Sequence, residues 1–254
     1  MNLARNNLEN FYFEGDNNCE YDNDLLEIEH YKNHPEMLPF VGKDYNKHEK
    51  RVLLIGESHY LSNENKRDVA KDFEKLNWYD NALSFNSSDF ENVFYKDFEN
   101  YATRHVVNRY ISPAGKNFKG SNGMFNQPIN AYYGKKEHSL MHNFAFMNFY
   151  QRPAFEYGKS IANINRDNEI ATKTLISVID VLKPSLIVFL STKAFNNFEK
   201  YYKKNYNEKL DENKFHKVPH PTCAWWYREY NGYNNYGLCK FKEILENAWG
   251  KYES

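Results

Sequence analysis

The stretch Lys50-Arg-Val-Leu-Leu-Ile-Gly-Glu-Ser-His-Tyr60 decides the fold of this chain. Its four consecutive apolar residues stop at Gly56, and such a short apolar run predicts a strand buried on both faces of a parallel sheet. Glycine permits a sharp turn or a close backbone approach at the strand's end. Because ligands of open α/β sheets bind at the carboxyl ends of strands, Glu57 and His59 become candidates for a functional site. An ordinary turn with solvated polar groups fits the same pattern.

Three more apolar runs predict strands, at residues 143–149, 185–190 and 215–219. Apolar residues at helical spacing predict helices between them, one beginning near Asp167 and one at Ser191 or Thr192, and a closing helix after the last strand. Strands that alternate with helices pair in parallel through right-handed crossovers. The sequence therefore predicts an α/β fold, a three-layer α/β/α sandwich with a central, mainly parallel sheet of about four strands.

The chain of 254 residues is long enough for one large domain, and we expect a single domain over residues 1–254. Residues 1–45 read as an N-terminal extension, a loose or docked arm followed by an acidic stretch with a short helix around Leu25. Residues 61–140 read as a long insertion. Within it, residues 112–125 hold three glycines and a proline and predict a loop, in which Lys116 and Lys119 stand among aromatic side chains.

Composition excludes several broad classes of function. The net charge of −1 leaves no global basic field, so any nucleic-acid contact must come from local patches. The 21 Tyr and 19 Phe suit surfaces that stack on planar or sugar-like ligands, although such rings also fill cores. Cys19, Cys223 and Cys239 form neither a disulfide framework nor a zinc pattern. Without a signal peptide or a membrane-length apolar run, we expect a cytoplasmic protein with no membrane contact and no obligate protein partner.

Four separated segments stand at the predicted strand ends: Gly56–Tyr60, Asn148–Pro153, Pro184–Ala194 and His220–Thr222. In this order they resemble the motifs of the uracil-DNA glycosylase superfamily, which has a short α/β/α fold. The first looks like the Gly-Glu-Ala-Pro-Gly motif of the iron–sulfur branch, so that Glu57 matches its glutamate. The second is similar to an Asn-then-Arg-Pro segment, one residue shorter here, and the last looks like the His-Pro-Ser motif.

Departures from the family pattern change what the resemblance implies. Ser58 stands where members often carry the Asp or Asn that handles the attacking water, and a serine is no base at neutral pH. Glu57 therefore becomes the leading candidate for positioning water, with His59 as its substitute. The cysteines that hold the iron–sulfur cluster are missing, so we expect no cluster and no other cofactor.

The chemistry of base excision assigns roles to these residue types. Breaking an N-glycosidic bond builds positive charge on the deoxyribose, which the Glu57 carboxylate can stabilise while it orients a water. Negative charge builds on the leaving base, and the His220 imidazole can donate to its oxygen. The amide of Asn148 presents both a donor and an acceptor to a pyrimidine edge. Tyr60 and Phe118 are further base-binding candidates.

A glycosylase must also flip its base and hold the DNA. The segment Cys223-Ala-Trp-Trp-Tyr-Arg228 follows His220 directly, where the family keeps a minor-groove wedge. An aromatic packing patch is the alternative interpretation of this segment. The candidate DNA-binding residues are Ser58, Lys119, Arg152, Thr222, Trp225, Trp226 and Arg228.

We therefore predict a DNA glycosylase that hydrolyses the N-glycosidic bond of an aberrant or modified pyrimidine and leaves an abasic site. The base is uracil or a bulky hypermodified phage base, and the second would make the enzyme part of phage defence. Two alternatives stay open: a catalytically silent DNA-binding module on the same fold, and a small-molecule hydrolase that uses Glu57 and His59. His138 and His142 have helical metal-ligand spacing, but no third ligand stands out, and we predict no metal site.

Overall fold

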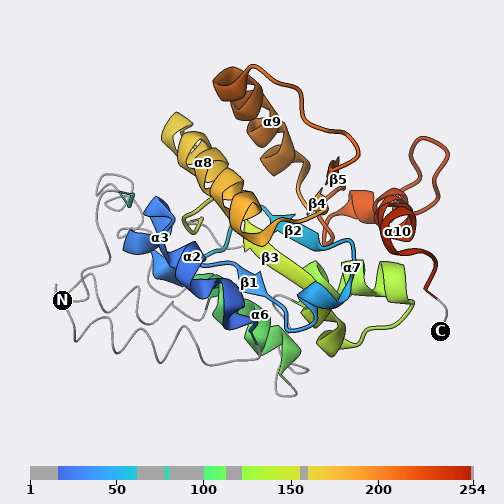
Figure 1. The fold of residues 1–254 in the computed structure, drawn as a ribbon. Coiled ribbons are helices and arrows are strands. Elements are labelled where there is room, and N and C mark those ends of the chain that lie inside the picture. Colours follow the sequence, from blue (N-terminus) through green and yellow to red (C-terminus); the bar gives the residue numbers. More distant parts are fainter. Residues whose placement is uncertain (1–16, 62–77, 80–99, 113–121, 155–159, 253–254) are drawn as a thin grey trace.

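The computed structural model describes residues 17–61, 78–79, 100–112, 122–154 and 160–252 (Figure 1). Its centre is a five-stranded sheet in the order β1-β3-β2-β4-β5. Four strands pair in parallel, namely β2 (Val52–Gly56), β3 (Phe144–Asn148), β4 (Leu186–Phe189) and β5 (Phe215–Lys217). The predicted α/β class and the mainly parallel sheet are confirmed, and each predicted strand is present with slightly shorter bounds.

The fifth strand comes from the predicted N-terminal extension. β1 (Phe40–Val41) pairs antiparallel with β3, so the sheet is one strand larger than predicted. Before it, α2 (Asp22–Leu26) and α3 (Glu29–Asn33) contact α8 (Asn165–Leu182). The short helix predicted around Leu25 is confirmed as α2, and residues 21–45 are part of the folded core, because their apolar side chains cover an edge and a face of the sheet. Most of the arm predicted for residues 1–20 lies outside the described residues. The described 3₁₀ turns are Cys19–Tyr21, Pro35–Met37, Tyr45–Lys47, His138–Asn143 and Ala224–Trp226.

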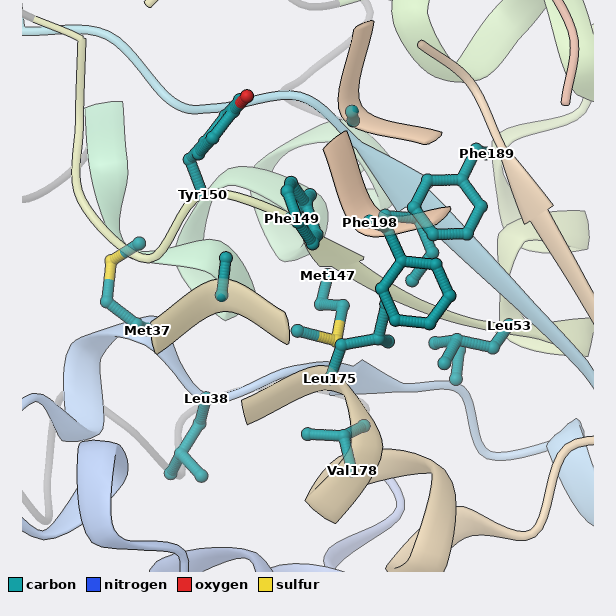
Figure 2. Close-up of a cluster of buried hydrophobic side chains, with 14 of the residues drawn as sticks. Met37, Leu38, Leu53, Met147, Phe149, Tyr150, Leu175, Val178, Phe189 and Phe198 are labelled. Atoms are coloured by element: carbon teal, nitrogen blue, oxygen red, sulfur yellow. The ribbon is translucent and has the colours of Figure 1, made fainter. Parts of the chain in front are cut away.

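Strand alternation divides the core into two clusters. Leu53 and Ile55 of β2 lie in one cluster, with α8 and α9 (Thr192–Tyr206), whereas Val52 and Leu54 lie in the other. Figure 2 shows the first cluster, where side chains of β3 and α8 meet Phe198 of α9. The second cluster packs the opposite face of the sheet against α6 (Thr103–Ile111), α7 (Asn122–Tyr133) and α10 (Tyr236–Trp249). Helices on both faces make the three layers that the sequence predicts.

The region 61–140 is only partly an insertion. α6 and α7 both bury apolar residues in the second cluster, so they form the crossover layer that connects β2 to β3. The predicted loop 112–125 is wrong at its end, because Asn122–Phe125 belongs to α7. Phe118 and Lys119 lie outside the described residues. No helix in the described ranges is long and apolar enough to cross a membrane.

A buried ion pair joins the segment after β3 to the start of α8. Arg152 Nε lies 2.7 Å from Asp167 Oδ1, and a terminal nitrogen of the same guanidinium lies 2.9 Å from Oδ2. The Asp167 carboxylate also accepts from the Tyr79 hydroxyl at 2.6 Å and from the Ile164 amide at 2.8 Å. Asp167 is thus the third residue of α8, and its carboxylate caps the helix by accepting from the amide of the N-cap residue Ile164. The prediction that Arg152 contacts DNA is wrong, because its charged group is buried and already paired.

Removing one partner of this pair leaves an uncompensated buried charge. We expect Arg152→Ala to lower the free energy of unfolding by about 3–5 kcal/mol, measured by urea denaturation. The matched control is Lys173→Ala, which removes the exposed pair with Glu169 and should cost less than about 1 kcal/mol. Equal losses in the two variants would contradict a structural role for Arg152.

Candidate functional site

The candidate site lies at the carboxyl edge of the parallel strands. β2 and β3 end side by side, with Gly56 paired to Asn148, and β4 ends at Phe189 on the other side of β2. Glu57 follows β2 directly, Ser191 lies two residues beyond β4, and His220 lies three residues beyond β5. The sheet therefore brings polar side chains from four separate parts of the sequence to one edge, as parallel pairing requires.

Hydrogen-bond donors surround the Glu57 carboxylate. Oε2 accepts from the Ser191 hydroxyl at 2.8 Å, while Oε1 accepts from the Ile161 amide at 3.3 Å and from the Ser160 hydroxyl. Lys193 Nζ lies 3.8 Å from Oε1. Donors from several directions match the acceptor-only chemistry of an ionised carboxylate. The side chain keeps 13% of its surface exposed, so it is held in place and still reaches solvent.

Two of these donors also hold the backbone around the site. The Ser191 hydroxyl accepts from the Ala194 amide at 3.2 Å and so caps α9 while it donates to Glu57. Lys193 donates to the Ser160 hydroxyl at 2.8 Å and to the Ile161 carbonyl. Sequence reasoning identified Ser191 only as a helix cap and did not identify Ser160 or Lys193. A serine and a lysine that open the helix after a buried strand were the available signal, whereas residue 160 carried none.

Asn148 lies against the glycine that ends β2. A Cβ atom at Gly56 would lie 2.1 Å from the Asn148 Oδ1 atom, so only glycine admits this approach. Asn148 is 4% exposed, and its side-chain amide makes no hydrogen bond within the described ranges. A buried amide normally has hydrogen-bond partners. Asn148 therefore holds a donor and an acceptor ready at the edge where β2 and β3 end.

His220 is oriented by the residue two positions after it. Its Nδ1 lies 3.3 Å from the Thr222 amide nitrogen and 2.9 Å from the Thr222 hydroxyl. A backbone amide can only donate, so Nδ1 accepts, and the proton of the neutral ring is on Nε2. Burial lowers the pKa of His220, and the negative charge of Glu57 opposes this shift only in part. At neutral pH the imidazole is thus uncharged, with an N–H donor on Nε2.

Two predicted site residues after Glu57 are buried instead of facing a ligand. Ser58 is 8% exposed and its hydroxyl is enclosed, so it does not present a contact to DNA. His59 is 6% exposed, and its Nε2 lies 3.0 Å from the Thr103 hydroxyl of α6. Burial, together with the charge of Arg109, lowers the pKa of His59 to about 3. The prediction that His59 is a catalytic substitute for Glu57 is therefore wrong. Tyr60 packs partly buried against the first core cluster.

The aromatic segment after His220 divides between core and surface. Trp226 is fully buried, and its ring would lie 2.8 Å from a Cβ atom at Gly237 of α10, so its predicted role in DNA binding is wrong. Trp225 is 47% exposed, with the Arg228 guanidinium 5.3 Å from the centre of its ring. Thr222 is also exposed, and its hydroxyl is engaged with His220.

The described ranges hold no group of three or more His, Cys, Asp and Glu side chains that could bind a metal ion. His138, one of the two histidines at metal-ligand spacing, has its Nδ1 2.8 Å from the Tyr110 carbonyl, to which it donates.

Comparisons of the chain with protein-family models, with curated proteins and with solved structures find no match. The chemistry of the site is therefore derived from its own residues.

The buried His59 makes stability depend on pH. In the unfolded chain its ring takes up a proton below its ordinary pKa of about 6.5, whereas the folded ring stays neutral down to about 3. The folded state therefore loses stability as the pH falls below 6.5, by about 1.4 kcal/mol for each pH unit. We expect the loss between pH 7 and pH 5 to be about 2 kcal/mol smaller in His59→Gln, measured by urea denaturation. An unchanged slope in His59→Gln would contradict the assignment.

Proposed function

We propose that this chain is a DNA glycosylase that hydrolyses the N-glycosidic bond of an aberrant or modified pyrimidine. The observation that carries the proposal is the meeting of three different groups at one sheet edge. They are a carboxylate on Glu57, an unengaged amide on Asn148 and a neutral N–H imidazole on His220. The resemblance of four sequence segments to the uracil-DNA glycosylase superfamily supports the same reaction.

Each of the three groups can bind or stabilise a different part of the substrate during this reaction. The Asn148 amide offers a donor and an acceptor, which complement the O4 and N3–H of a flipped uracil-like base. As the glycosidic bond stretches, the base oxygens gain negative charge, and the Nε2 proton of His220 stabilises it. The sugar gains positive charge, and the Glu57 carboxylate stabilises that charge and orients the attacking water. The water's oxygen bonds to the sugar carbon as the bond from that carbon to the base nitrogen breaks, and the electron pair of the broken bond leaves with the base. The water gives a proton to the Glu57 carboxylate, and the base anion takes up a proton from solvent.

The donors around Glu57 keep it in place during this reaction. Ser191 and the Ile161 amide fix the two carboxylate oxygens, so the group need not reorganise when the sugar becomes positive. Lys193 lies near the same carboxylate and offsets its charge before the substrate enters. We assign Ser191, Ser160 and Lys193 positioning roles, because their contacts run to Glu57 and to the backbone near it.

Exposed rings beside His220 support DNA as the substrate. Trp225, Tyr227 and Tyr230 are 47%, 50% and 46% exposed, and they follow the His220 segment on one loop. Trp225 and Tyr230 contact edge to face at 5.7 Å, with Arg228 over Trp225. Such rings stack on unpaired bases, and the arginine can contact a phosphate. The loop thus suits the strand around a flipped nucleotide.

Loss of either polar group should slow the chemical step. We expect Glu57→Gln and His220→Ala to excise bases about 10²–10⁴-fold more slowly than the parent, because each removes a positioned charge or donor. Excision is measured as alkali-sensitive breaks in oligonucleotides that carry either uracil or a bulky C5-substituted pyrimidine. Glu169→Gln, an exposed carboxylate on α8, is the matched control and should excise at the parental rate.

The same assay separates the remaining interpretations. Breaks only with the bulky substituted base would favour a defence role against modified phage DNA, and breaks with uracil alone would favour repair. DNA binding without breaks on either substrate would favour a catalytically silent module. A small-molecule hydrolase that pairs Glu57 with His59 has lost its support, since His59 is buried against Thr103.

The exposed loop gives a separate prediction for DNA affinity. We expect Trp225→Ala to weaken binding of a single-stranded oligonucleotide about fivefold to 100-fold, as the loss of one stacked base implies. Fluorescence anisotropy measures the dissociation constant. Tyr206→Ala removes an exposed ring of similar size from α9 and is the control. If both variants bind like the parent, the loop is not a docking surface.

A further inference from the structure

A cavity of about 380 Å³ lies away from the candidate active site. Its walls come from residues that precede β2 and β3, from the end of α7 and from the residues after α10, which places it at the amino edge of the parallel strands. Glu57, Asn148 and His220 lie at the carboxyl edge. The volume falls in the range of roughly 300–1,000 Å³ that small-molecule sites occupy. The lining residues that matter here are His48, Tyr132, Tyr133, Trp249, Lys251 and Tyr252.

The aromatic walls of this cavity are fixed in place. Tyr133 meets Tyr132 and Tyr252 edge to face, at centroid distances of 4.8 Å in both pairs. The ring of His48 stacks on Trp249 at 4.2 Å. The Tyr132 hydroxyl donates to the Gly250 carbonyl at 2.9 Å, and the Trp249 indole donates to the Lys50 carbonyl at 2.6 Å. The rings are therefore already ordered before a ligand binds, so binding would lose little side-chain conformational entropy.

One charged group at the cavity remains available to a ligand. The exposed Lys251 has no ion pair within the described ranges. The Tyr133 hydroxyl is enclosed among its neighbours, so Tyr133 offers the cavity its ring alone. The amide of Asn143 is engaged by His48 at 3.0 Å and by the Leu140 carbonyl at 3.1 Å.

The charges around the cavity favour an anion over a cation. Lys251 is the one Lys, Arg, Asp or Glu side chain among the described lining residues. Lys135 lies 5.8 Å from the centre of the Tyr252 ring and pairs with Glu137 at 2.9 Å. Glu246, which lies close enough to Tyr132 to raise its pKa in part, lies 3.7 Å from Lys242. The nearby carboxylates are thus offset, and the ammonium of Lys251 is not.

We propose that this cavity binds a nucleoside monophosphate. The base packs against the tyrosine and tryptophan rings, and the Lys251 ammonium binds the phosphate. A flat ring with a terminal anion is the ligand chemistry that matches both the aromatic walls and the available ammonium of Lys251. The site is independent of the proposed glycosylase reaction and would stand if that reaction were disproved.

The test is calorimetric titration of the full chain with adenosine, guanosine, cytidine and uridine 5′-monophosphates and with the four nucleosides. We expect at least one nucleotide to bind with a dissociation constant below about 1 mM, which is ordinary for weak small-ligand binding. Lys251→Ala should weaken that nucleotide about tenfold and leave its nucleoside unchanged. Tyr252→Ala, which removes one partly exposed ring of the wall, should weaken both severalfold, because the base loses a packing surface.

Two controls make the result specific to this cavity. Lys240→Ala removes a lysine of α10 that is not among the described lining residues, and it should bind the nucleotide like the parent. Glu57→Gln should also bind like the parent, and weaker binding in this variant would place the nucleotide at the other edge and overturn the proposal. So would the absence of binding by all four nucleotides, an unchanged affinity in Lys251→Ala, or tighter binding of tetramethylammonium than of any nucleotide.

Discussion

The structure depends on the parallel pairing of β2 with β3 on one side and β4 on the other. A central strand with both neighbours and both faces occupied has no freedom to slip, because a shift of one residue would exchange its two apolar faces. This register sets Gly56 beside Asn148 and directs Glu57 out of the sheet. The positions of Glu57, Asn148 and Ser191 at the sheet edge follow from that pairing. The position of His220 follows from the pairing of β5 with β4.

The carboxylate of Glu57 then links parts of the chain that are far apart in sequence. Ser191 reaches it from the end of β4, and Ser160 and Ile161 reach it from the segment before α8. A charge at a half-buried edge requires such donors, and the donors in turn fix the backbone on either side. The same contacts that stabilise the edge also hold the Glu57 carboxylate in the position that the proposed reaction requires.

The two edges of the sheet differ in chemistry although the same strands supply both. At the carboxyl edge, a carboxylate, an amide and an imidazole gather beside exposed rings on the loop after His220. At the amino edge, tyrosines and Trp249 enclose a cavity near Lys251. Only the carboxyl edge was identified from the sequence, because a strand end followed by polar residues is a local pattern. The cavity at the amino edge forms between α7 and the residues after α10, and no local pattern in the sequence indicates it.

The sequence by itself determined the α/β class, the four parallel strands and the position of Glu57, Asn148 and His220 after strand ends, because hydrophobic periodicity and strand polarity are local. Only the tertiary structure decided which polar residues are buried. Ser58, His59, Arg152 and Trp226 look in sequence like the candidate site residues near them. In the structure, Ser58 and Trp226 are buried, His59 contacts Thr103, and Arg152 pairs with Asp167. The short β1 and the hydrogen bond from Ser160 to Glu57 were equally hidden, since each joins segments more than a hundred residues apart that meet only when the sheet closes.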